Sequence, residues 1–591
     1  MSSIVEEIDL QEPAAKKIKL EGSPKGEVNP DSKVEEIIQP RGESDVGITE
    51  YISSHAGFSG ILKYRFSDFI VHEIDTEGNV VHLTTLECPQ EEVPEIESSS
   101  GILSEEVMSQ LGALKKGSKE TVSIDVTDLD KAARKAIHQA IRQNYSHLMS
   151  DTREEEGRKV IVAQPQGNPK GQRSQWPPTR GNYLHFILYK ENLDTMDAIA
   201  KIAGHIRMNP SSFSYAGTKD RRAKTTQWVA AYRLKAETLA KLNHKLRNMT
   251  TGNYTYKPAP LKFGDSLGNR FTLVLRDVRA PKEELVSAVE VLKTLGFINY
   301  YGMQRFGNAD VPTHKIGLAL ITQQWEEVVK LILQPRSSTS DMFEKALRIW
   351  SETRDAEKAW DVLPVKSCIE GHLLRGLKSS NGKDYVKALG FIARNTRLMY
   401  LHSYQSYVWN RVTSRRIKEL GLKPVVGDLW QPDKEDPRTV TEEDIAQGKV
   451  TIHQIVLPLP GHSVTYPQHP ELMAWYQEIL AQDGLTLTSF DTNAVKTYAL
   501  CGTYRNIVTL PSNVEWDLVP YDDPALPLFP SDLDLLNNLP QPERPEQAKH
   551  KALTIQFSLG TGSYATMALR ELLKMDTSHA ALKESSVKIH Q

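Results

Sequence analysis

A mixed α+β fold is predicted by three features of the sequence: alternating strand segments, amphipathic helical segments, and a strand, glycine-rich turn and helix near the carboxyl end. Residues 60–74 and 270–278 alternate apolar and polar side chains with the period of two that strands require. Residues 281–296 have the periodicity of an amphipathic helix, which ends at Gly296. The segment 553–574 combines both patterns around its turn, so strands and helices are mixed along the chain.

The remaining elements follow in order along the chain. Residues 88–118 are rich in Glu, Ser, Pro and Gly, which indicates a loop or an insertion, and a helical stretch follows near 126–146. Apolar residues at helical spacing predict another helix over 196–206. The segment 213–234 predicts two strands joined by a tight basic loop. Residues 310–505 then mix helices and loops.

Length and composition limit the classes of protein that fit. The 591 residues exceed what one hydrophobic core usually organises, so two or more folded units are expected. At 39% hydrophobic and 25% charged residues, the composition is typical of a soluble globular protein, without an apolar run that could span a bilayer. The acidic start lacks the apolar stretch of a secretory signal. Cys88, Cys368 and Cys501 lie far apart, which argues against a disulfide framework or a zinc site and favours a reducing compartment.

The first 48 residues are polar, acidic and poor in aromatic side chains, which predicts a disordered tail. Within this tail, the segment PAAKKIKLE carries a basic cluster of Lys16, Lys17 and Lys19. The cluster is similar to a short nuclear localisation signal, although short basic runs often match by chance. The resulting prediction is a nuclear protein that can also occur in the cytoplasm.

The net charge of −3 conceals a segregation of charge along the chain. Residues 1–50 carry 6 Lys/Arg against 12 Asp/Glu, whereas residues 201–250 carry 11 Lys/Arg against 2 acids, a local balance of +9. A basic segment inside a near-neutral protein is typical of a surface that binds phosphates. A solvated basic face is the alternative, and charge alone leaves both interpretations open.

The loop between the two strands of 213–234 places one acid among cations. Its Asp220 is flanked by Lys219, Arg221, Arg222 and Lys224. Four cations around one carboxylate favour its ionised form, and a loop position exposes it to a substrate. A surface turn with ordinary ion pairs explains the same charges, so the charge pattern alone does not establish a catalytic role.

The run AGTKDRRAKTTQW at 216–228 resembles the signature of the TruD family of pseudouridine synthases, an Ala-Gly-x-Lys-Asp loop followed by a Thr-x-Gln-Trp strand. Four further blocks resemble segments of the same family: GILKYRFSDFIVHEI, GNRFTLVLRDV, NYYGMQRFG and FSLGTGSYATMALREL. The five blocks occur in the family's order between residues 60 and 573. The chain is therefore identified as a member of this family, and its length, acidic tail and insertion are most similar to the eukaryotic branch.

The resemblance implies roles for individual residues. Asp220 matches the family's nucleophile, and Lys63 matches the lysine that faces this carboxylate. Tyr301 matches the aromatic residue that stacks on the uracil; bacterial relatives usually have Phe at this position, and tyrosine keeps the stacking face. The other implied substrate-binding residues are Phe69 and Phe557, which line the uridine pocket, and Asn299, which contacts the base or the sugar.

The resemblance also implies an architecture: a mixed, largely antiparallel pseudouridine-synthase sheet with helices, interrupted by an inserted TRUD domain, with RNA between the two. The turn at 560–563 before the closing helix is a helix cap, an RNA phosphate site, or both. The expected order is a tail at 1–48, a catalytic domain at 49–295 with an insertion near 85–180, the TRUD domain at 296–506, the closing part of the catalytic domain at 507–575, and a tail at 576–591.

Isomerising a uridine moves its glycosidic bond from N1 to C5 of the uracil without a redox change or an added group. No metal and no cofactor are therefore expected, and a carboxylate serves as nucleophile or as base at the sugar. The implied partner is RNA: tRNA, and for the eukaryotic branch also small nuclear RNA and mRNA, bound by a monomer with no membrane association. The alternatives are a catalytically silent RNA-binding scaffold or regulator, and a hydrolase with two carboxylates. An intact Asp220 with Lys63 argues against the first, and the basic loop argues against the second.

Overall fold

The structure is a computed structural model of the 591-residue chain, and it describes residues 42–89, 102–115, 118, 120–145, 147–155, 157–165, 176–177, 180–307, 310–336, 340–432, 435–491, 498–578 and 581. The basic cluster with Lys16 and most of both expected tails lie outside these residues. The end of the first tail is described: Val46 is buried, and the carbonyls of Val46 and Gly47 accept hydrogen bonds from Asn410 and Ser414.

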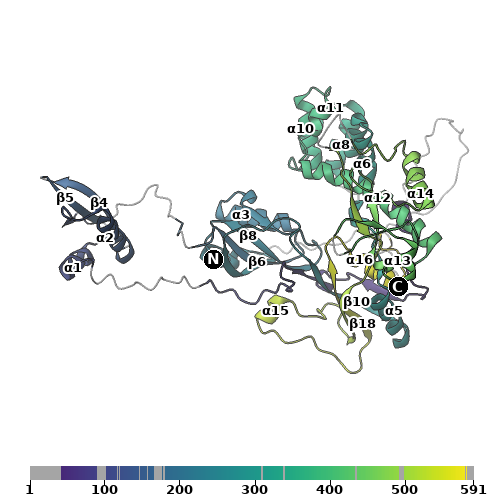
Figure 1. Ribbon diagram of the computed structural model, residues 1–591, viewed down its shortest axis with the longest axis horizontal. Helices are drawn as coiled ribbons and strands as arrows, with labels where there is room; N and C mark the ends of the chain where they lie inside the picture. The colour runs from purple at the N-terminus through teal and green to yellow at the C-terminus, as the bar shows by residue number, and fades with distance from the viewer. Residues whose placement is uncertain are drawn as a thin grey trace, which may run out of the picture. The chain divides into compact units, whose positions relative to one another are not determined.

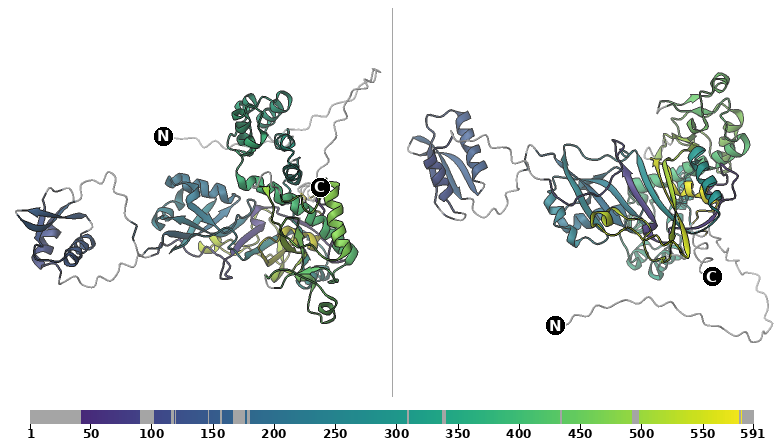
Figure 2. Two further views of the ribbon diagram at one scale, coloured as in Figure 1. Left: turned by 45° about the horizontal axis from the view of Figure 1, so that its top comes forward. Right: turned by 90° about the horizontal axis from the view of Figure 1, so that it is seen from below.

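The largest sheet within the described residues has nine strands (Figure 1). They are β1 (Ser59–Leu62), β2 (Phe69–Ile74), β6 (Tyr183–Glu191), β7 (Phe213–Tyr215), β8 (Lys224–Tyr232), β9 (Met249–Lys257), β10 (Gly268–Arg279), β17 (Ser512–Tyr521) and β18 (His550–Gly560). The main path runs β17, β18, β10, β2, β8, β6, β9, and the right view of Figure 2 shows strands of this sheet side by side. β1 pairs with β10, and β7 pairs with β8. Of these described pairings only that of β2 with β8 is parallel, which confirms the predicted mixed, largely antiparallel sheet of an α+β fold.

β10 lies in the middle of this sheet. Its Phe271 is opposite Val71 of β2 on one side and Phe557 of β18 on the other. Leu273 and Leu275 continue the same buried face, as the alternation in the sequence predicts. Segments from the beginning, the middle and the end of the chain therefore meet around Phe271.

α3 (Thr195–Ile206) confirms the helix that the sequence predicts over 196–206. Ile199, Ile202 and Ala203 pack in one core with side chains of β6 and β8. The Asp194 side chain caps its first turn by accepting a hydrogen bond from a backbone N–H, which satisfies a donor that the helix itself cannot pair. Through this shared core, α3 packs beside β8, the strand that follows the Asp220 loop.

α5 (Lys282–Thr294) and α16 (Ala565–Leu573) confirm the predicted helix at 281–296 and the closing helix. α16 is held by the first described segment of the chain. Its buried Arg570 pairs with Glu43 at 2.5 Å, and Glu571 accepts a hydrogen bond from the Ile52 N–H. The first described segment therefore stabilises the helix near the end of the described chain. This helix directly follows β18, which has an interior place in the sheet.

The described residues between 102 and 165 form a small sheet with a hydrophobic core of its own. Its strands run in the order β3 (Val122–Asp125), β5 (Arg158–Pro165) and β4 (Leu148–Glu155), accompanied by α1 (Glu105–Ala113) and α2 (Lys131–Asn144). α2 confirms the helix predicted near 126–146. Of the two interpretations of 88–118, a loop does not hold for α1, because Ser104 caps that helix and Leu111 is buried in the small core, whereas an insertion is compatible with it.

Helices make up about half of the described residues of the segment 296–506, where the inserted domain is expected. α12 (Arg394–Leu420) packs against α6 (Thr313–Ile321), α14 (Pro470–Gln482) and β14 (Ile455–Leu459). The indole of its fully buried Trp409 donates to the Leu457 carbonyl at 3.1 Å. None of the described helices has the length and apolarity needed to cross a membrane. The elements are β11 (Phe297–Ile298), α6 (Thr313–Ile321), α7 (Trp325–Ile332), α8 (Asp341–Thr353), α9 (Ala356–Val362), α10 (Ile369–Ser379), α11 (Tyr385–Leu389), α12, β12 (Leu429–Trp430), β13 (Arg438–Thr439), α13 (Glu442–Ala446), β14 (Ile455–Leu459), α14 (Pro470–Gln482) and β15 (Thr503–Asn506), after which β16 (Val508–Thr509) pairs with β11.

Candidate active site

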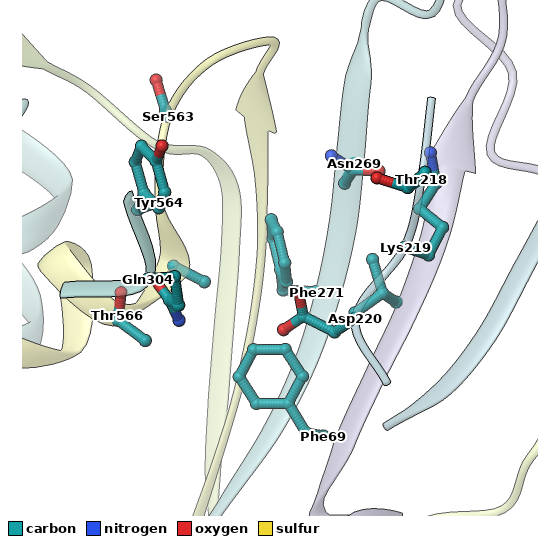
Figure 3. A pocket seen from close by; sticks show the side chains of 12 residues that line it. Phe69, Thr218, Lys219, Asp220, Asn269, Phe271, Gln304, Ser563, Tyr564 and Thr566 are labelled. Atoms are coloured by element: carbon teal, nitrogen blue, oxygen red, sulfur yellow. The ribbon is translucent and has the colours of Figure 1, made fainter. Parts of the chain in front are cut away.

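A cavity of about 190 Å³ opens where β2, β10 and the loop between β7 and β8 meet the turn before α16. Figure 3 shows Asp220 on one side of the cavity and Tyr564 on the other, with the ring of Phe271 between them. The lining residues are Phe69, Val71, Thr218, Lys219, Asp220, Asn269, Phe271, Gln304, Ser563, Tyr564, Ala565 and Thr566.

Three of the predicted site residues come together at this cavity. The Asp220 side chain is 47% exposed, and its Oδ2 lies 3.3 Å from Nζ of Lys63. The same Nζ lies 3.7 Å from the centre of the Phe69 ring, so one cation contacts both the carboxylate and an aromatic wall. Lys63 has a left-handed backbone with φ of +54°, a conformation that costs a non-glycine residue about 1–3 kcal/mol and is often found at functional sites.

The cations around Asp220 have different partners, which the charge pattern did not predict. Arg222 donates from Nη2 to the carbonyl of Lys63 at 2.9 Å, and thereby holds the segment that carries the lysine. Lys219 points inward, where its Nζ pairs with Oε2 of the buried Glu73 at 2.6 Å. Glu73 also accepts a hydrogen bond from the Trp228 N–H of β8 through its other oxygen. This ion pair ties the loop to two strands of the sheet.

Below the loop lies a second buried lysine. Lys190 of β6 donates from Nζ to the Asp220 carbonyl at 2.9 Å and to the Lys219 carbonyl at 3.3 Å. Burial lowers the pKa of Lys190 to about 8, although the charges of Asp194 and Asp220 oppose the shift. The Lys190 ammonium group therefore holds the backbone of the Asp220 loop in place.

Two neutral side chains complete the support of the loop. Thr195 accepts a hydrogen bond from the Lys219 N–H at 3.1 Å and donates to the amide oxygen of Gln227 at 3.0 Å. The amide nitrogen of Gln227 donates to the Gly217 carbonyl at 2.8 Å. Sequence reasoning missed these positioning roles, yet Gln227 and Glu73 both lie inside the motifs that carry the family resemblance.

Three other predicted site residues do not line the cavity but lie behind the residues that line it. Phe557 is fully buried, and its ring centre is 5.7 Å from that of Phe271, which lines the cavity. Tyr301 is 7% exposed and meets Tyr564 edge-on with ring centres 6.2 Å apart. The amide group of Asn299, itself buried, is occupied by protein partners: it donates to the Asn506 carbonyl and accepts from Arg505. In this structure Asn299 and Tyr301 thus support the cavity wall and do not face the cavity.

The lining also includes polar residues that are not among the predicted catalytic and substrate-binding residues, although Ser563 belongs to the turn predicted as a helix cap or an RNA phosphate site. Asn269, Gln304, Ser563 and Thr566 bring amide and hydroxyl groups to the cavity. Gln304 lies within NYYGMQRFG, and Ser563 and Thr566 lie within the closing block FSLGTGSYATMALREL. Membership in these motifs therefore indicates which residues lie near the cavity. It does not indicate which of them line the cavity and which lie behind the lining residues.

One group of described residues has the chemistry of metal ligands. His72, His82 and Asp532 bring ring nitrogens and a carboxylate oxygen within 4.8 Å of one another. His72 follows Val71 on β2, and because side chains alternate along a strand, it faces the opposite side of the sheet from Phe69 and Val71, which line the cavity. One carboxylate oxygen of Asp532 lies 2.9 Å from a nitrogen of each imidazole, and the other accepts from the Leu83 N–H. These contacts fasten α15 (Asp532–Leu536) to the back of the sheet.

The chain is similar to known pseudouridine synthases. A family model described as tRNA pseudouridine synthase D (TruD) matches residues 161–572. The chain is 46% identical over 543 residues to the pseudouridylate synthase 7 homolog of Mus musculus, across 91% of this chain and 82% of that protein. It is 36% identical over 625 residues to the multisubstrate pseudouridine synthase 7 of Schizosaccharomyces pombe, across 90% of each. A crystal structure described as a TruD protein of Methanosarcina mazei shares the fold, with a TM-score of 0.54 and 21% identity across 90% of this chain and 97% of that one. The chain therefore belongs to the TruD family of pseudouridine synthases, which are RNA-modifying isomerases.

Proposed function

We propose that this pseudouridine synthase uses the Asp220 carboxylate as the nucleophile on a uridine held in the cavity. The observation that carries the proposal is the position of the carboxylate, half-exposed at the cavity wall and 3.3 Å from the Lys63 ammonium. Among the described lining residues Asp220 is the only acid, which disfavours a hydrolase that needs two carboxylates. The intact ion pair also argues against a catalytically silent scaffold.

The proposed reaction conserves the atoms of the uridine. The bond from N1 to C1′ breaks, the detached uracil turns, and a bond forms from C5 to C1′; C5 loses a proton and N1 gains one. Asp220 serves this sequence by adding to C6 or C1′, or by removing a ribose proton. The target base leaves its helical stack before it enters the cavity. Stacking on Phe69 or Phe271 would return about 1–3 kcal/mol of that cost.

We further propose that the RNA substrates are tRNA together with small nuclear RNA and mRNA. The name of the S. pombe relative, a multisubstrate pseudouridine synthase, supports more than one class of substrate. Chemical mapping of pseudouridine in cells with and without this protein should reveal sites in each class that disappear together. A matched line that expresses the Asp220→Ala variant separates loss of catalysis from loss of the protein. Sites confined to tRNA would contradict the broader assignment.

Phosphate binding is proposed for a basic strip formed by Lys241, Lys245 and Arg247. All three side chains are exposed, and none is within ion-pair distance of an acid among the described residues. They lie after α4 (Ala236–Ala240), ahead of β9 in the segment with the +9 balance. Replacing all three by Gln should weaken RNA binding for any sequence and flatten its salt dependence by about 0.7–0.9 in logarithmic slope per lost phosphate contact.

The measurement is the RNA dissociation constant as a function of salt. The rate on saturating RNA should change little, because phosphates remote from the chemistry contribute uniform binding. A matched control replaces Lys330, Lys358 and Lys378 by Gln, since these lysines carry the same total charge but pair with neighbouring acids. Equal salt slopes for the two triple variants would identify the basic strip as a solvated surface.

Nuclear localisation through Lys16, Lys17 and Lys19 is also a proposal. A fluorescent fusion that lacks residues 1–25 should shift toward the cytoplasm, because the basic cluster would no longer contact an import receptor. A fusion in which the three lysines alone become Gln is the matched control for the rest of the tail. Unchanged nuclear fluorescence of both fusions would mark the cluster as a chance match.

A further inference from the structure

Arg505 is a buried cation for which the described residues supply no anion. Its side chain comes from β15 and is only 9% exposed. Nε donates to the backbone carbonyl of Asn299, and Nη2 donates to the side-chain oxygen of the same residue, each at 2.8 Å. The other neighbours are aromatic: the guanidinium lies 4.0 Å from the ring centre of Tyr301 and 6.0 Å from that of Tyr564. Burying a charge without a counter-ion is costly, so an anion is expected to come from outside the protein.

A second arginine lies on the same aromatic ring. Arg305 ends the 3₁₀ turn Met303–Arg305, and its guanidinium lies 5.3 Å from the ring centre of Tyr301. Its Nε is buried, and no described residue accepts a hydrogen bond from it. No acid among the described residues lies within ion-pair distance of either arginine. Two like charges against one ring repel each other unless an anion joins them.

The turn before α16 brings further donors to the same place. At Gly562, whose φ is +82°, a Cβ would lie 3.3 Å from Nη1 of Arg505, so the turn passes close to that guanidinium. α16 begins at Ala565 without a side-chain cap, and the N–H groups of a first helical turn have no partner within the helix. The hydroxyl of Thr566 is buried without a hydrogen-bond partner among the described residues, and it belongs to the cavity lining (Figure 3).

We propose that Arg505, Arg305 and the first turn of α16 bind a backbone phosphate of the RNA next to the target uridine. This proposal rests on the proposed function of the same cavity. Every group gathered here donates hydrogen bonds or carries positive charge, which suits the oxygens of a phosphodiester. The first turn of α16 lies across the cavity from Asp220 (Figure 3). A phosphate bound there would hold the ribose of the target uridine between this phosphate site and the Asp220 carboxylate. The RNA strand would then bind in one register.

The test replaces Arg305 by Gln, because Arg305 makes no hydrogen bond or ion pair from its side chain to a described residue and its loss should not disturb the fold. Arg505 is less suitable, since it also holds Asn299. RNA oligonucleotides that carry a single neutral methylphosphonate on the 5′ or the 3′ side of the target uridine serve as probes. Binding is measured in the Asp220→Ala background, so that no turnover occurs during the experiment.

One of the two methylphosphonates should weaken binding by about ten-fold, the effect of one lost charge-assisted contact. The Arg305→Gln variant should bind natural RNA about ten-fold more weakly. The methylphosphonate that weakens binding to the protein with Arg305 should lower the affinity of this variant little further, because the two changes remove the same contact. A matched control, Arg354→Gln, removes an arginine 4.4 Å from the ring centre of Trp350 elsewhere and should keep the full ten-fold effect. Equal methylphosphonate effects in wild-type and Arg305→Gln protein, or no effect in either, would overturn the phosphate site. Pseudouridine formation by Asp220→Ala would overturn the proposed nucleophile instead, and the binding data would be unaffected.

Discussion

Replacing Asp220 by alanine should abolish pseudouridine formation and leave RNA binding close to that of the wild-type protein. The carboxylate is the only acid among the described residues that line the cavity, so no neighbour can take its place as nucleophile. RNA binding should survive because it is spread over many phosphate contacts. The measurement is pseudouridine content by mass spectrometry of nucleosides after single-turnover reactions, together with the dissociation constant for the same RNA.

Asp220→Asn is the matched variant, since it keeps the shape of the side chain and removes the charge and the nucleophile. It should be as inactive as the alanine variant and should remain folded. More than a trace of pseudouridine from either variant would assign the nucleophile to another group. A collapse of RNA binding would instead show that Asp220 has a structural role in the loop.

Lys63→Met should lower the single-turnover rate by about 10²–10³-fold, the range typical of losing one preorganised charge at a reacting group. Its Nζ is 3.3 Å from the Asp220 carboxylate and 3.7 Å from the Phe69 ring centre, so methionine would keep the packing and remove the charge. The rate should fall more than the RNA affinity, because the Lys63 charge acts on the Asp220 carboxylate and not on the bound RNA backbone. The measurement is the rate at saturating RNA.

Lys63→Arg should restore part of the rate, since a guanidinium keeps the charge but has a planar geometry and a greater length. Lys262→Met is a control for the general loss of one exposed lysine outside the cavity. If Lys63→Met reacts at the wild-type rate, the carboxylate needs no cation, and the left-handed backbone at Lys63 would have to serve another purpose.

The meeting of Asp220, Lys63 and Phe69 could be predicted because each residue lies in a motif that resembles a segment of the TruD family, and the resemblance implied it. Lys63 and Phe69 flank the short turn that leads into β2, and β2 pairs with β8, which begins at Lys224 just after the Asp220 loop. Local sequence and one strand pairing are sufficient to bring the three together. The fold class could be predicted for the same reason, since alternation in β10 and helical periodicity in α3 are local patterns.

The partners of the remaining residues could not be predicted, because they depend on contacts without a local signal. The sequence groups Lys219 with the cations around Asp220, but successive side chains of a tight loop point in different directions, and Lys219 is buried against Glu73. The sequence predicts that Tyr301 stacks on the uracil, and it gives no sign that Arg505, 206 residues after Asn299, lies 4.0 Å from the centre of the Tyr301 ring. Only the folded chain reveals that neighbour.

Because β18 (His550–Gly560) has an interior place in the sheet, residues 550–560 are decisive for the folding of the newly made protein. β18 lies between β17 and β10, and Phe557 packs behind Phe271 at the cavity. A nascent chain on the ribosome would present the edge of β10 unpaired until residue 560 has emerged, and such an edge invites aggregation. The enzyme therefore completes its sheet and its cavity only after residue 560 has been synthesised. A premature stop before His550 should yield material that chaperones or proteases remove, not a weakened enzyme.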